Sequence, residues 1–565
     1  MNQSLTYADK PWLKSYQLGP YKLEKSLAPY PELPVFKALD DAAEKYPGQT
    51  AVLYLERSLK YQQLRILVDK LASALAALGV RKGDRICVFL PNCMEFLICD
   101  WAIQKTGAVI VPTSILRTQE GLLHEVTASG SRMIICREEY LDRVMEIREK
   151  CGFEHIIITS TQGFDVAEVQ SKLPTGVYEF RKLLESYDAV PPKVAIDARE
   201  DLCELAFTGG ATGVPKGVMV THFNRYSCIL QGLPWLFKPV LRGFVGKASV
   251  IVPIPVFHSY GHFVLQIAAY LGLRVILMPD PRDKDLLVEY LVKYRPFLIP
   301  AVPTQLMRIA EADLVRMNVL PMSASAPLPL EVAEAIKKKI GMPVSEGYGL
   351  TETSPSTHYN LSSFSKVTGF MLKEKYGIGV PSPDTECKLV DPETGEEVPF
   401  GQPGELMVRG PEIMKGYWPE PGSGLTADGW LPTGDIAVMD EDGYFQLVDR
   451  IKDMVNVSGM KVYTTSVDEV LFKHPAVLMA AAFGVPDLNN PGSERVMAVI
   501  RLRDGYGDKV TYEEIQAYCR EHLPPYAVPK YIEFRDELPL TVTEKVFKKA
   551  LRDEAIAKMK DQVGK

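Results

Sequence analysis

A glycine-rich segment, TGGATGVPKG at residues 208–217, has the composition of a phosphate-binding loop. Its glycines would let successive backbone N–H groups converge on an anion without side-chain obstruction. Thr208 and Thr212 could add hydroxyl donors, and Lys216 could add a positive charge. The alternative is a plain turn, since Gly and Pro interrupt any chain. A Walker-type loop is disfavoured, because that pattern needs Gly directly before its Lys and Ser or Thr after it.

Two histidines four residues apart, His258 and His262 in PVFHSYGH, have a spacing that helical metal sites use. No HExxH glutamate and no third ligand accompanies them in the sequence. The favoured interpretation is therefore a pocket wall or a core histidine.

The elements around the loop follow a strand and helix alternation. DLCELAF before it has the pattern of a strand, and GVMVTHFNRYSCIL after it begins like a strand and becomes helical. The same alternation occurs at 58–80, 249–256, 273–278 and 297–302. Strands that alternate with helices predict an α/β fold with mainly parallel sheets.

The pattern changes after about residue 376. Short alternating strands separated by Gly, Pro and Asp-Gly turns predict an antiparallel β unit over about 376–449. Helical patterns return beyond Arg450 and indicate a small α/β domain. We therefore expect a large N-terminal domain over 1–449 and a small C-terminal domain over 450–565.

Bulk composition excludes several classes of protein. The 565 residues are 46% hydrophobic and 24% charged with a net charge of −7, which fits a globular protein and argues against a nucleic-acid surface. Nine scattered cysteines without a CxxC pair predict reduced thiols, mostly in the core, and a cytoplasmic protein. The N-terminus has no signal-peptide pattern. The longest apolar stretch, 263–278, is too short and interrupted to span a membrane.

Five motifs in sequence order resemble the adenylate-forming (ANL) superfamily, which contains acyl- and aryl-CoA synthetases, peptide-synthetase adenylation domains and beetle luciferases. They are TGGATGVPKG, EGYGLTET (346–353), GELMVRGPEIMKGYW (404–418), the segment 429–463 that contains TGD and VDR, and LPLTVTEKVFKKAL (538–551). The similarity covers about residues 30–555. It implies two layered α/β subdomains and an antiparallel β subdomain in the large domain, with a small mobile C-terminal domain.

The resemblance implies an acyl-CoA synthetase that uses ATP, Mg²⁺ and CoA. The acid would attack the α-phosphate of ATP to give acyl-AMP and pyrophosphate, and CoA would then displace AMP. A medium- or long-chain fatty acid is the favoured substrate. The alternatives are an aryl acid, a carrier protein in place of CoA, a luciferase-like oxygenase, and an inactive nucleotide- or lipid-binding relative. Peripheral membrane contact and a homodimer are both compatible with the sequence.

The same resemblance gives each motif residue an expected role. Lys545 would be the catalytic lysine of adenylation, Thr351 would contact the α-phosphate, and Glu352 would bind Mg²⁺. The expected nucleotide-binding residues are Thr208, Gly209, Gly210, Ala211, Thr212, Gly213, Lys216, Ser325, Ala326, Pro327, Gly347, Tyr348, Gly349, Asp435 and Arg450. The acyl pocket would include His258, Ser259 and Gly261, the domain hinge would be about 450–452 with Lys452, and the CoA side would include Ser458 and Gly459.

Each of these roles has a plainer alternative. Tyr348 could be a core tyrosine, and Asp435 could be a turn residue. Arg450 could form a surface ion pair, and Ser458–Gly459 could be an ordinary turn. Lys545 could be a solvated lysine, as we expect for Lys548 and Lys549 beside it.

Three departures from the family pattern stand out. Gly209 and Ala211 stand where the family usually has Ser or Thr, so two hydroxyl side chains are missing. Glu544 replaces the glycine before the catalytic lysine. The segment KVYTTSVDEV also lacks the usual Pro and Glu. They could mean slow turnover, an altered equilibrium of domain rotation, or a divergent branch of the family.

Overall fold

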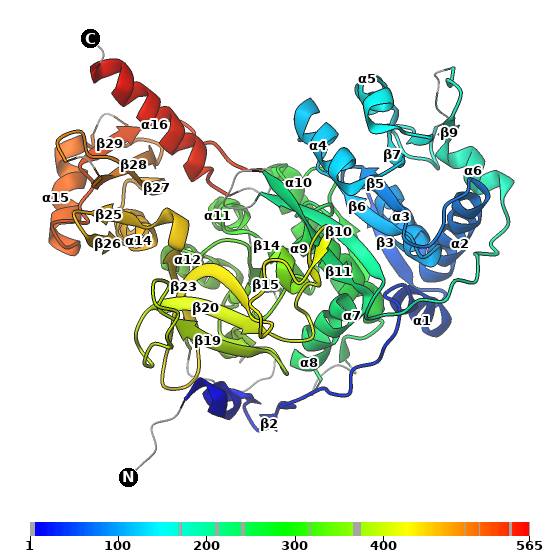
Figure 1. Cartoon of the computed structure of the whole chain (residues 1–565). Helices are drawn as coiled ribbons and strands as arrows, with labels where there is room; N and C mark the ends of the chain where they lie inside the picture. The colour runs from blue at the N-terminus through cyan, green and yellow to red at the C-terminus, as the bar shows by residue number, and fades with distance from the viewer. Residues whose placement is uncertain are drawn as a thin grey trace.

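The computed structural model describes residues 6–167, 169, 172–209, 214–238, 243–314, 316–317, 319–364, 374–490, 492–507, 509–541 and 545–563. Gly210, Ala211, Thr212, Gly213 and Glu544 lie outside these residues. Figure 1 shows two bodies, a large one that contains the first two sheets and a small one that carries the C-terminal elements.

The first sheet has nine strands in the part of the chain that the structure describes. Its order is β22 (Glu420–Pro421), β21 (Gly416–Tyr417), β11 (Pro215–Thr221), β10 (Leu202–Gly209), β6 (Val109–Pro112), β5 (Arg85–Phe89), β7 (Met133–Arg137), β8 (His155–Thr159) and β9 (Val177–Glu179). From β10 to β9 all pairs are parallel. The strands MIICR and HIIIT are almost entirely buried, as expected for parallel strands covered on both faces.

The second sheet also has nine strands among the described residues. Its order is β18 (Val380–Pro381), β17 (His358–Tyr359), β16 (Ser345–Tyr348), β15 (Leu320–Ser323), β14 (Leu298–Ala301), β12 (Ser249–Val252), β13 (Arg274–Leu277), β3 (Thr50–Tyr54) and β4 (Arg57–Lys60). From β16 to β3 the pairs are parallel.

Helices cover both sheets, and several begin at a side-chain cap. Their bounds are α1 (Lys37–Lys45), α2 (Tyr61–Ala77), α3 (Met94–Lys105), α4 (Gln119–Ser129), α5 (Leu141–Cys151), α6 (Phe180–Ser186), α7 (His222–Gln231), α8 (Leu233–Leu236), α9 (Ser259–Tyr270), α10 (Lys284–Tyr294), α11 (Pro303–Glu311) and α12 (Leu330–Ile340). Thr118, Thr221 and Asp283 accept backbone N–H groups at the starts of α4, α7 and α10. All twelve residues of α3 are buried, so this helix lies inside the large body.

An antiparallel four-stranded sheet follows, in the order β19 (Glu386–Val390), β20 (Gly404–Arg409), β23 (Leu431–Met439) and β24 (Phe445–Arg450). The C-terminal body contains β25 (Val455–Val457), β26 (Met460–Val462), α14 (Thr464–Lys473), β27 (Val477–Pro486), β28 (Glu494–Leu502), α15 (Tyr512–His522), β29 (Tyr531–Phe534) and α16 (Lys548–Val563). The short pair β1 (Gln17–Leu18) and β2 (Tyr21–Lys22) lies near the N-terminus. The expected fold class, two layered α/β subdomains with an antiparallel β subdomain and a small C-terminal unit, is confirmed.

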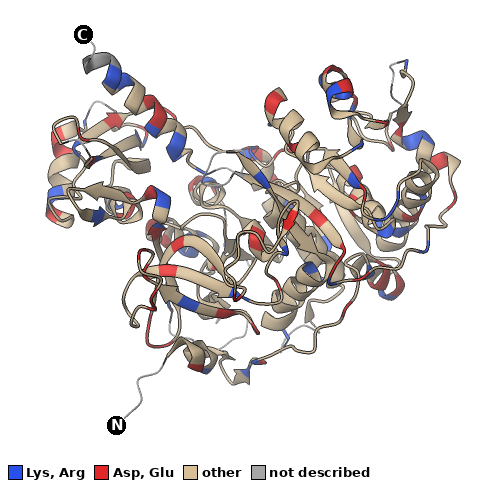
Figure 2. Cartoon of the chain, in the orientation of Figure 1, with Lys and Arg blue, Asp and Glu red and all other residues tan. Residues whose placement is uncertain are grey.

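Charge and cysteine placement agree with an ordinary globular surface and core. Figure 2 shows acidic and basic residues interspersed along the helices of both bodies. Eight of the nine cysteines are buried and Cys151 is half-buried, which confirms that most of them are core residues. Within the described residues, no helix has the length and apolar character needed to cross a membrane.

Candidate active site

The glycine-rich segment joins two strands of a hairpin. Strands β10 and β11 pair antiparallel, with Thr208 opposite Lys216 and Gly209 opposite Pro215. The strand before the segment and the change from strand to helix after it, at α7, agree with the sequence pattern. The segment therefore does connect two strands, and it places Thr208 and Lys216 opposite each other at the same end of β10 and β11.

Tyr417 connects the end of this hairpin to the expected magnesium ligand. Strand β21 pairs with β11, so Tyr417 lies opposite Val218. The ammonium of Lys216 is 5.2 Å from the centre of the Tyr417 ring, and the Tyr417 hydroxyl donates to Glu352 Oε1 at 2.8 Å. Lys216 and Glu352, which are far apart in the sequence, thus share one aromatic neighbour.

Thr351 and Glu352 lie on a single 3-10 turn, Thr351–Thr353, that follows β16. The Thr351 hydroxyl is 3.1 Å from the Ser259 hydroxyl at the start of α9, and the Glu352 carbonyl accepts the Met414 amide at 2.8 Å. The turn is packed so closely that a Cβ at Gly349 would lie 1.9 Å from the Pro355 carbonyl oxygen. Only glycine fits there, because any side chain would displace the backbone.

Asp435 is buried and accepts two hydrogen bonds in the large body. The Tyr348 hydroxyl lies 2.7 Å from Asp435 Oδ2, and Arg450 Nε lies 3.0 Å from Asp435 Oδ1. Asp435 and Arg450 are also direct partners across β23 and β24. Burial and the Asp435 carboxylate raise the pKa of Tyr348 well above its ordinary value. Tyr348 is therefore buried, as expected for a core tyrosine, but its hydroxyl also belongs to the group of polar side chains around Asp435.

Lys545 lies among these groups although it belongs to the C-terminal body. Burial, with the nearby cations Arg450 and Lys452, lowers the pKa of Lys545 to about 7, while Asp435 acts in the opposite direction. Burial and the Lys545 charge lower the pKa of His258 to about 4. Lys545 is thus not a solvated tail lysine, and the structure brings it to the face that contains Asp435 and His258.

The expectation that Lys548 is solvated is wrong. Its ammonium donates to Asp468 at 2.8 Å and to the Thr464 hydroxyl at 3.0 Å, because α16 and α14 both pack on β27. Lys549 is exposed, as expected.

The Thr464 turn is itself bound to the end of the large body. Asp449, which pairs with Ile436 across β24 and β23, accepts the Thr464 amide and, at 3.3 Å, the Thr464 hydroxyl. The next turn, Ile451–Asp453, contains the expected hinge residue Lys452. The chain therefore passes from the large body to the small one through a segment that side-chain hydrogen bonds fix on both sides.

Most of the remaining motif residues lie in loops. Ser325 has a positive φ of 77° in the loop after β15 that includes Ala326 and Pro327. Gly347 is the exception and lies in β16. Ser458 and Gly459 form the turn between β25 and β26, where the Ser458 amide donates to Ser493 at 2.9 Å. This contact stays inside the C-terminal body, so the structure does not bring the Ser458–Gly459 turn to the groups around Asp435.

His258 and His262 have different surroundings. His258 precedes α9, and its Nδ1 accepts the Tyr260 amide at 3.4 Å. Gly261 lies so close to the preceding loop that a Cβ would be 2.2 Å from the Pro255 carbonyl oxygen. His262 is completely buried, with Nε2 2.9 Å from Asp100 and Nδ1 3.3 Å from Glu204. Among the described residues no group of three or more His, Cys, Asp or Glu side chains has the arrangement of a metal site.

The protonation of His262 makes stability depend on pH. Burial lowers its pKa, but Asp100 from α3 and Glu204 from β10, which is itself paired with Arg225 from α7, outweigh burial and raise it to about 9. A raised pKa gives stability that is complete below the unfolded value of about 6.5 and is lost as pH rises through 9.

We expect the melting temperature of the protein to fall by several degrees between pH 7 and 9.5, and by less in a His262→Gln variant. Thermal melts at matched ionic strength would measure both. Equal losses in the two proteins would contradict a protonated His262.

Two features of this face were missed by sequence reasoning. Tyr417 belongs to the GY pair of the motif at residues 404–418, and that pair was the available signal in the sequence. The charges Asp100, Glu204 and Arg225 had no sequence signal, because they lie on three elements that only the fold brings together.

Comparison with known proteins gives consistent matches over nearly the whole chain. The family model described as AMP-binding enzyme matches residues 39–418, and the model of the AMP-binding enzyme C-terminal domain matches residues 466–545. A long-chain-fatty-acid–CoA ligase of Bacillus subtilis (strain 168) is 32% identical over 97% of this chain and 98% of its own length. The enzyme of the same name from Escherichia coli O157:H7 is 32% identical over 97% of this chain and 99% of its own.

Solved structures with the same fold include one that holds a reaction intermediate. The anthranilate CoA ligase AuaEII in complex with anthranoyl-AMP has a TM-score of 0.83 and 25% identity, covering 94% of this chain and 99% of its own. A benzoate CoA ligase from Burkholderia xenovorans LB400, at 24% identity and a TM-score of 0.78, shares the fold.

Proposed function

Because the chain belongs to the AMP-binding enzyme family, we propose that it is an ATP-dependent acyl-CoA synthetase whose acid substrate is a medium- or long-chain fatty acid. The observation that carries the proposal is Lys545, a lysine of the C-terminal body that lies close enough to Asp435, Arg450 and His258 of the large body for their charges to act on one another. The reaction activates the acid as acyl-AMP with release of pyrophosphate and then transfers the acyl group to CoA.

In the first half-reaction the groups of this face act by position and charge. Thr208, Lys216 and the loop amides would bind the β- and γ-phosphates, with Thr351 at the α-phosphate. Asp435 would accept hydrogen bonds from the ribose hydroxyls, since one carboxylate suits a vicinal diol. Lys545 would lie between the acid carboxylate and the α-phosphate, where an ammonium reduces their repulsion and the charge of the transition state.

The residues present fit a Mg²⁺ ion bound together with ATP. Glu352 is a half-buried carboxylate whose Oε1 is fixed by the Tyr417 hydroxyl, and Mg²⁺ prefers one or two carboxylates completed by phosphate oxygens and water. When bound, the ion neutralises phosphate charge. Glu352 would hold it next to Thr351, and Tyr417 would orient the carboxylate.

The second half-reaction would follow a rotation of the C-terminal body about 451–453. We propose a domain boundary at about residue 450, with Lys452 in the hinge, so that rotation withdraws Lys545 and turns the Ser458–Gly459 loop towards the acyl-AMP. A few residues at the end of an element are enough to absorb such a change of φ and ψ.

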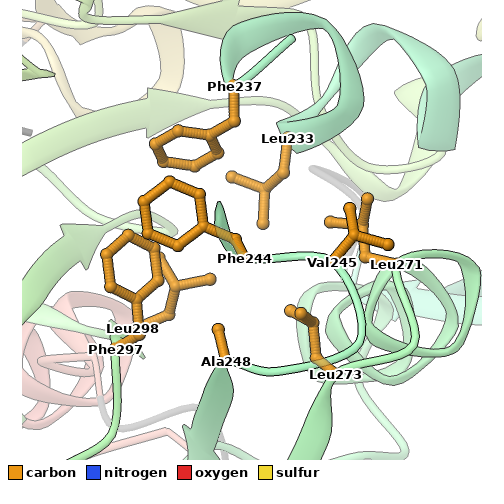
Figure 3. Close-up of a pocket in the computed structure, with 9 residues that line it drawn as sticks. All are labelled: Leu233, Phe237, Phe244, Val245, Ala248, Leu271, Leu273, Phe297 and Leu298. Carbon is orange, nitrogen blue, oxygen red and sulfur yellow. The ribbon is translucent and has the colours of Figure 1, made fainter. Parts of the chain in front are cut away.

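A small apolar cavity, with room for about one water molecule as it stands, would accept the end of a long aliphatic acid once its lining side chains move apart. Figure 3 shows it enclosed by nine apolar side chains, Leu233, Phe237, Phe244, Val245, Ala248, Leu271, Leu273, Phe297 and Leu298. Ala248, Leu273 and Phe297 directly precede β12, β13 and β14. The cavity therefore lies at the amino ends of these strands, opposite the carboxyl ends that carry the polar groups.

Helix α9 spans the distance between the Thr351 turn and this cavity. It begins at Ser259, beside Thr351, and its twelve residues reach Tyr270, next to the cavity residue Leu271, which is a distance of about 18 Å. An acid activated beside Thr351 would need an extended alkyl chain, and side chains that move aside, to reach this cavity. Burial of that chain supplies affinity in proportion to the apolar area removed from water.

The test is to incubate the protein with ATP, Mg²⁺ and a panel of palmitate, octanoate and benzoate, with and without CoA. Acyl-CoA formed together with AMP and pyrophosphate, with palmitate or octanoate preferred, supports the proposal. Preference for benzoate favours an aryl-CoA ligase. Bound nucleotide without release of pyrophosphate would refute the proposed enzymatic function.

Filling the cavity should shorten the preferred acid. We expect Ala248→Phe to lower kcat/KM for palmitate by about tenfold or more relative to octanoate, because a few methylenes lose their space. Steady-state kinetics with both acids measures the ratio.

Ala557→Phe, on the exposed face of α16, is the matched control and should leave that ratio unchanged. An unchanged ratio in the cavity variant would exclude this cavity as the end of the acyl site.

A further inference from the structure

A cluster of four charged side chains is buried where the two large sheets meet. Asp100 from α3, Glu204 from β10, Arg225 from α7 and His262 from α9 are each no more than 1% exposed. Arg225 pairs with Glu204, Glu204 contacts His262, and His262 contacts Asp100. With His262 protonated the cluster has two negative and two positive charges, so it is neutral as a whole.

The polar atoms of the cluster are only partly satisfied. Glu204 Oε1 and Arg225 Nε have no hydrogen-bond partner within the described residues. The amide oxygens of Gln104 and Gln266 have none either, although the amide nitrogens of both residues donate to Asp100. Burying charges costs more than their mutual attraction returns unless the geometry is very good. The cluster is therefore not explained by stability alone.

The cluster is connected to both ends of the turn that carries Thr351 and Glu352. At one end, Ser259 on α9 contacts the Thr351 hydroxyl at 3.1 Å, three residues before His262 on the same helix. At the other end, Arg225 Nη1 donates to the Ser354 carbonyl oxygen at 3.0 Å. The ion pairs fix α7 against α9 and thereby fix the two side chains that hold the turn.

We propose that Arg225 is a positioning residue for the magnesium and α-phosphate turn, and that the Glu204, His262 and Asp100 side chains hold it in place. Arg225 does not touch the reacting atoms. It sets the Ser354 carbonyl and with it the direction of the Glu352 carboxylate two residues earlier. This inference rests on the proposed function, because it assigns the geometry of a site that binds ATP with Mg²⁺.

The test is ATP binding by isothermal titration calorimetry, with Mg²⁺ and with EDTA, in a Glu204→Gln/Arg225→Met double variant. Both charges are removed together, since removing one would leave the other buried and unpaired. We expect ATP affinity in Mg²⁺ to fall by about tenfold, as is usual for residues that orient a metal ligand, and affinity in EDTA to stay unchanged.

A matched control is the buried Lys105 at the C-terminal end of α3, which pairs with the half-buried Asp40 and Asp69, each 2.6 Å away. The variant Lys105→Met/Asp40→Asn/Asp69→Asn removes the whole group and should bind ATP like the wild type in both solutions. If the first double variant does not fold, Arg225→Lys replaces it, because lysine keeps the charge beside Glu204 but lacks the second nitrogen that reaches Ser354.

Three results would overturn the proposal. Unchanged affinity in Mg²⁺ would show that Arg225 does not position the turn. An equal fall in Mg²⁺ and in EDTA would show a general structural effect. A wild-type protein that binds no ATP in either solution would refute the proposed function itself, and this outcome is separate because it appears before any variant is made.

Discussion

Replacing Lys545 by alanine is expected to slow acyl-AMP formation by about 100-fold or more, the usual cost of removing a charged group aimed at a transition state. Conversion of supplied acyl-AMP and CoA to the thioester should remain near the wild-type rate. The difference arises because Lys545 lies within electrostatic reach of Asp435 and His258 in the described arrangement and would leave when the small body rotates. Pyrophosphate exchange measures the first half-reaction, and single-turnover thioester formation measures the second.

The pKa of Lys545 gives this variant a second signature. A lysine whose pKa is lowered to about 7 is charged below that pH and loses its proton above it. We therefore expect kcat/KM for wild-type adenylation, which reports the free enzyme, to decline above about pH 7. Bound ATP and carboxylate favour the ammonium, so the decline in kcat should occur at higher pH. In Lys545→Ala this decline of kcat/KM with rising pH should be absent.

Lys549→Ala is the matched control, since Lys549 is an exposed lysine four residues further along the same segment. It should change neither half-reaction. Equal loss of both half-reactions in Lys545→Ala would contradict the domain-rotation account.

Replacing Glu352 by glutamine should lower adenylation by about 100-fold at limiting Mg²⁺ and raise the Mg²⁺ concentration needed for half-maximal rate. The amide keeps an oxygen that can accept the Tyr417 hydroxyl but loses the negative charge that suits a hard cation. Initial rates of pyrophosphate release over a range of Mg²⁺ measure the effect.

Tyr417→Phe separates the charge of Glu352 from its orientation. This variant keeps the ring beside Lys216 and removes only the hydroxyl that fixes Oε1, so its loss should be well below that of Glu352→Gln. A Glu352→Gln enzyme with the Mg²⁺ dependence of the wild type would exclude Glu352 as the magnesium ligand.

Much of the fold was predictable because its signals are local. Runs such as MIICR and SVIV identify buried parallel strands by composition, and the Asp-Gly turns identify the antiparallel unit. The two strands at the glycine-rich segment followed from DLCELAF and GVMVTH on either side, whereas their antiparallel pairing was not predicted. These patterns need only neighbouring residues to be read.

The rest could not be read from the sequence because it depends on contacts between distant segments. Lys548 has the sequence surroundings of a solvated lysine, and only the packing of α16 and α14 on β27 gives it Asp468 as a partner. The contact of Glu352 with Tyr417 joins segments that two different sheets place together. Asp100 lies within a mostly apolar helix that also contains Glu95, Gln104 and Lys105, and nothing near it in the chain indicates His262.

The hydrogen bonds of Asp449 have an energetic consequence for turnover. Asp449 belongs by strand pairing to the large body, whereas Thr464, whose amide and hydroxyl it accepts, belongs to the small one. Rotation about 451–453 would have to break these bonds at every cycle and restore them afterwards. They therefore bias the resting population towards the arrangement with Lys545 in place. To shift the enzyme to the rotated arrangement, CoA must bind that arrangement more tightly, by at least the difference in free energy between the two arrangements.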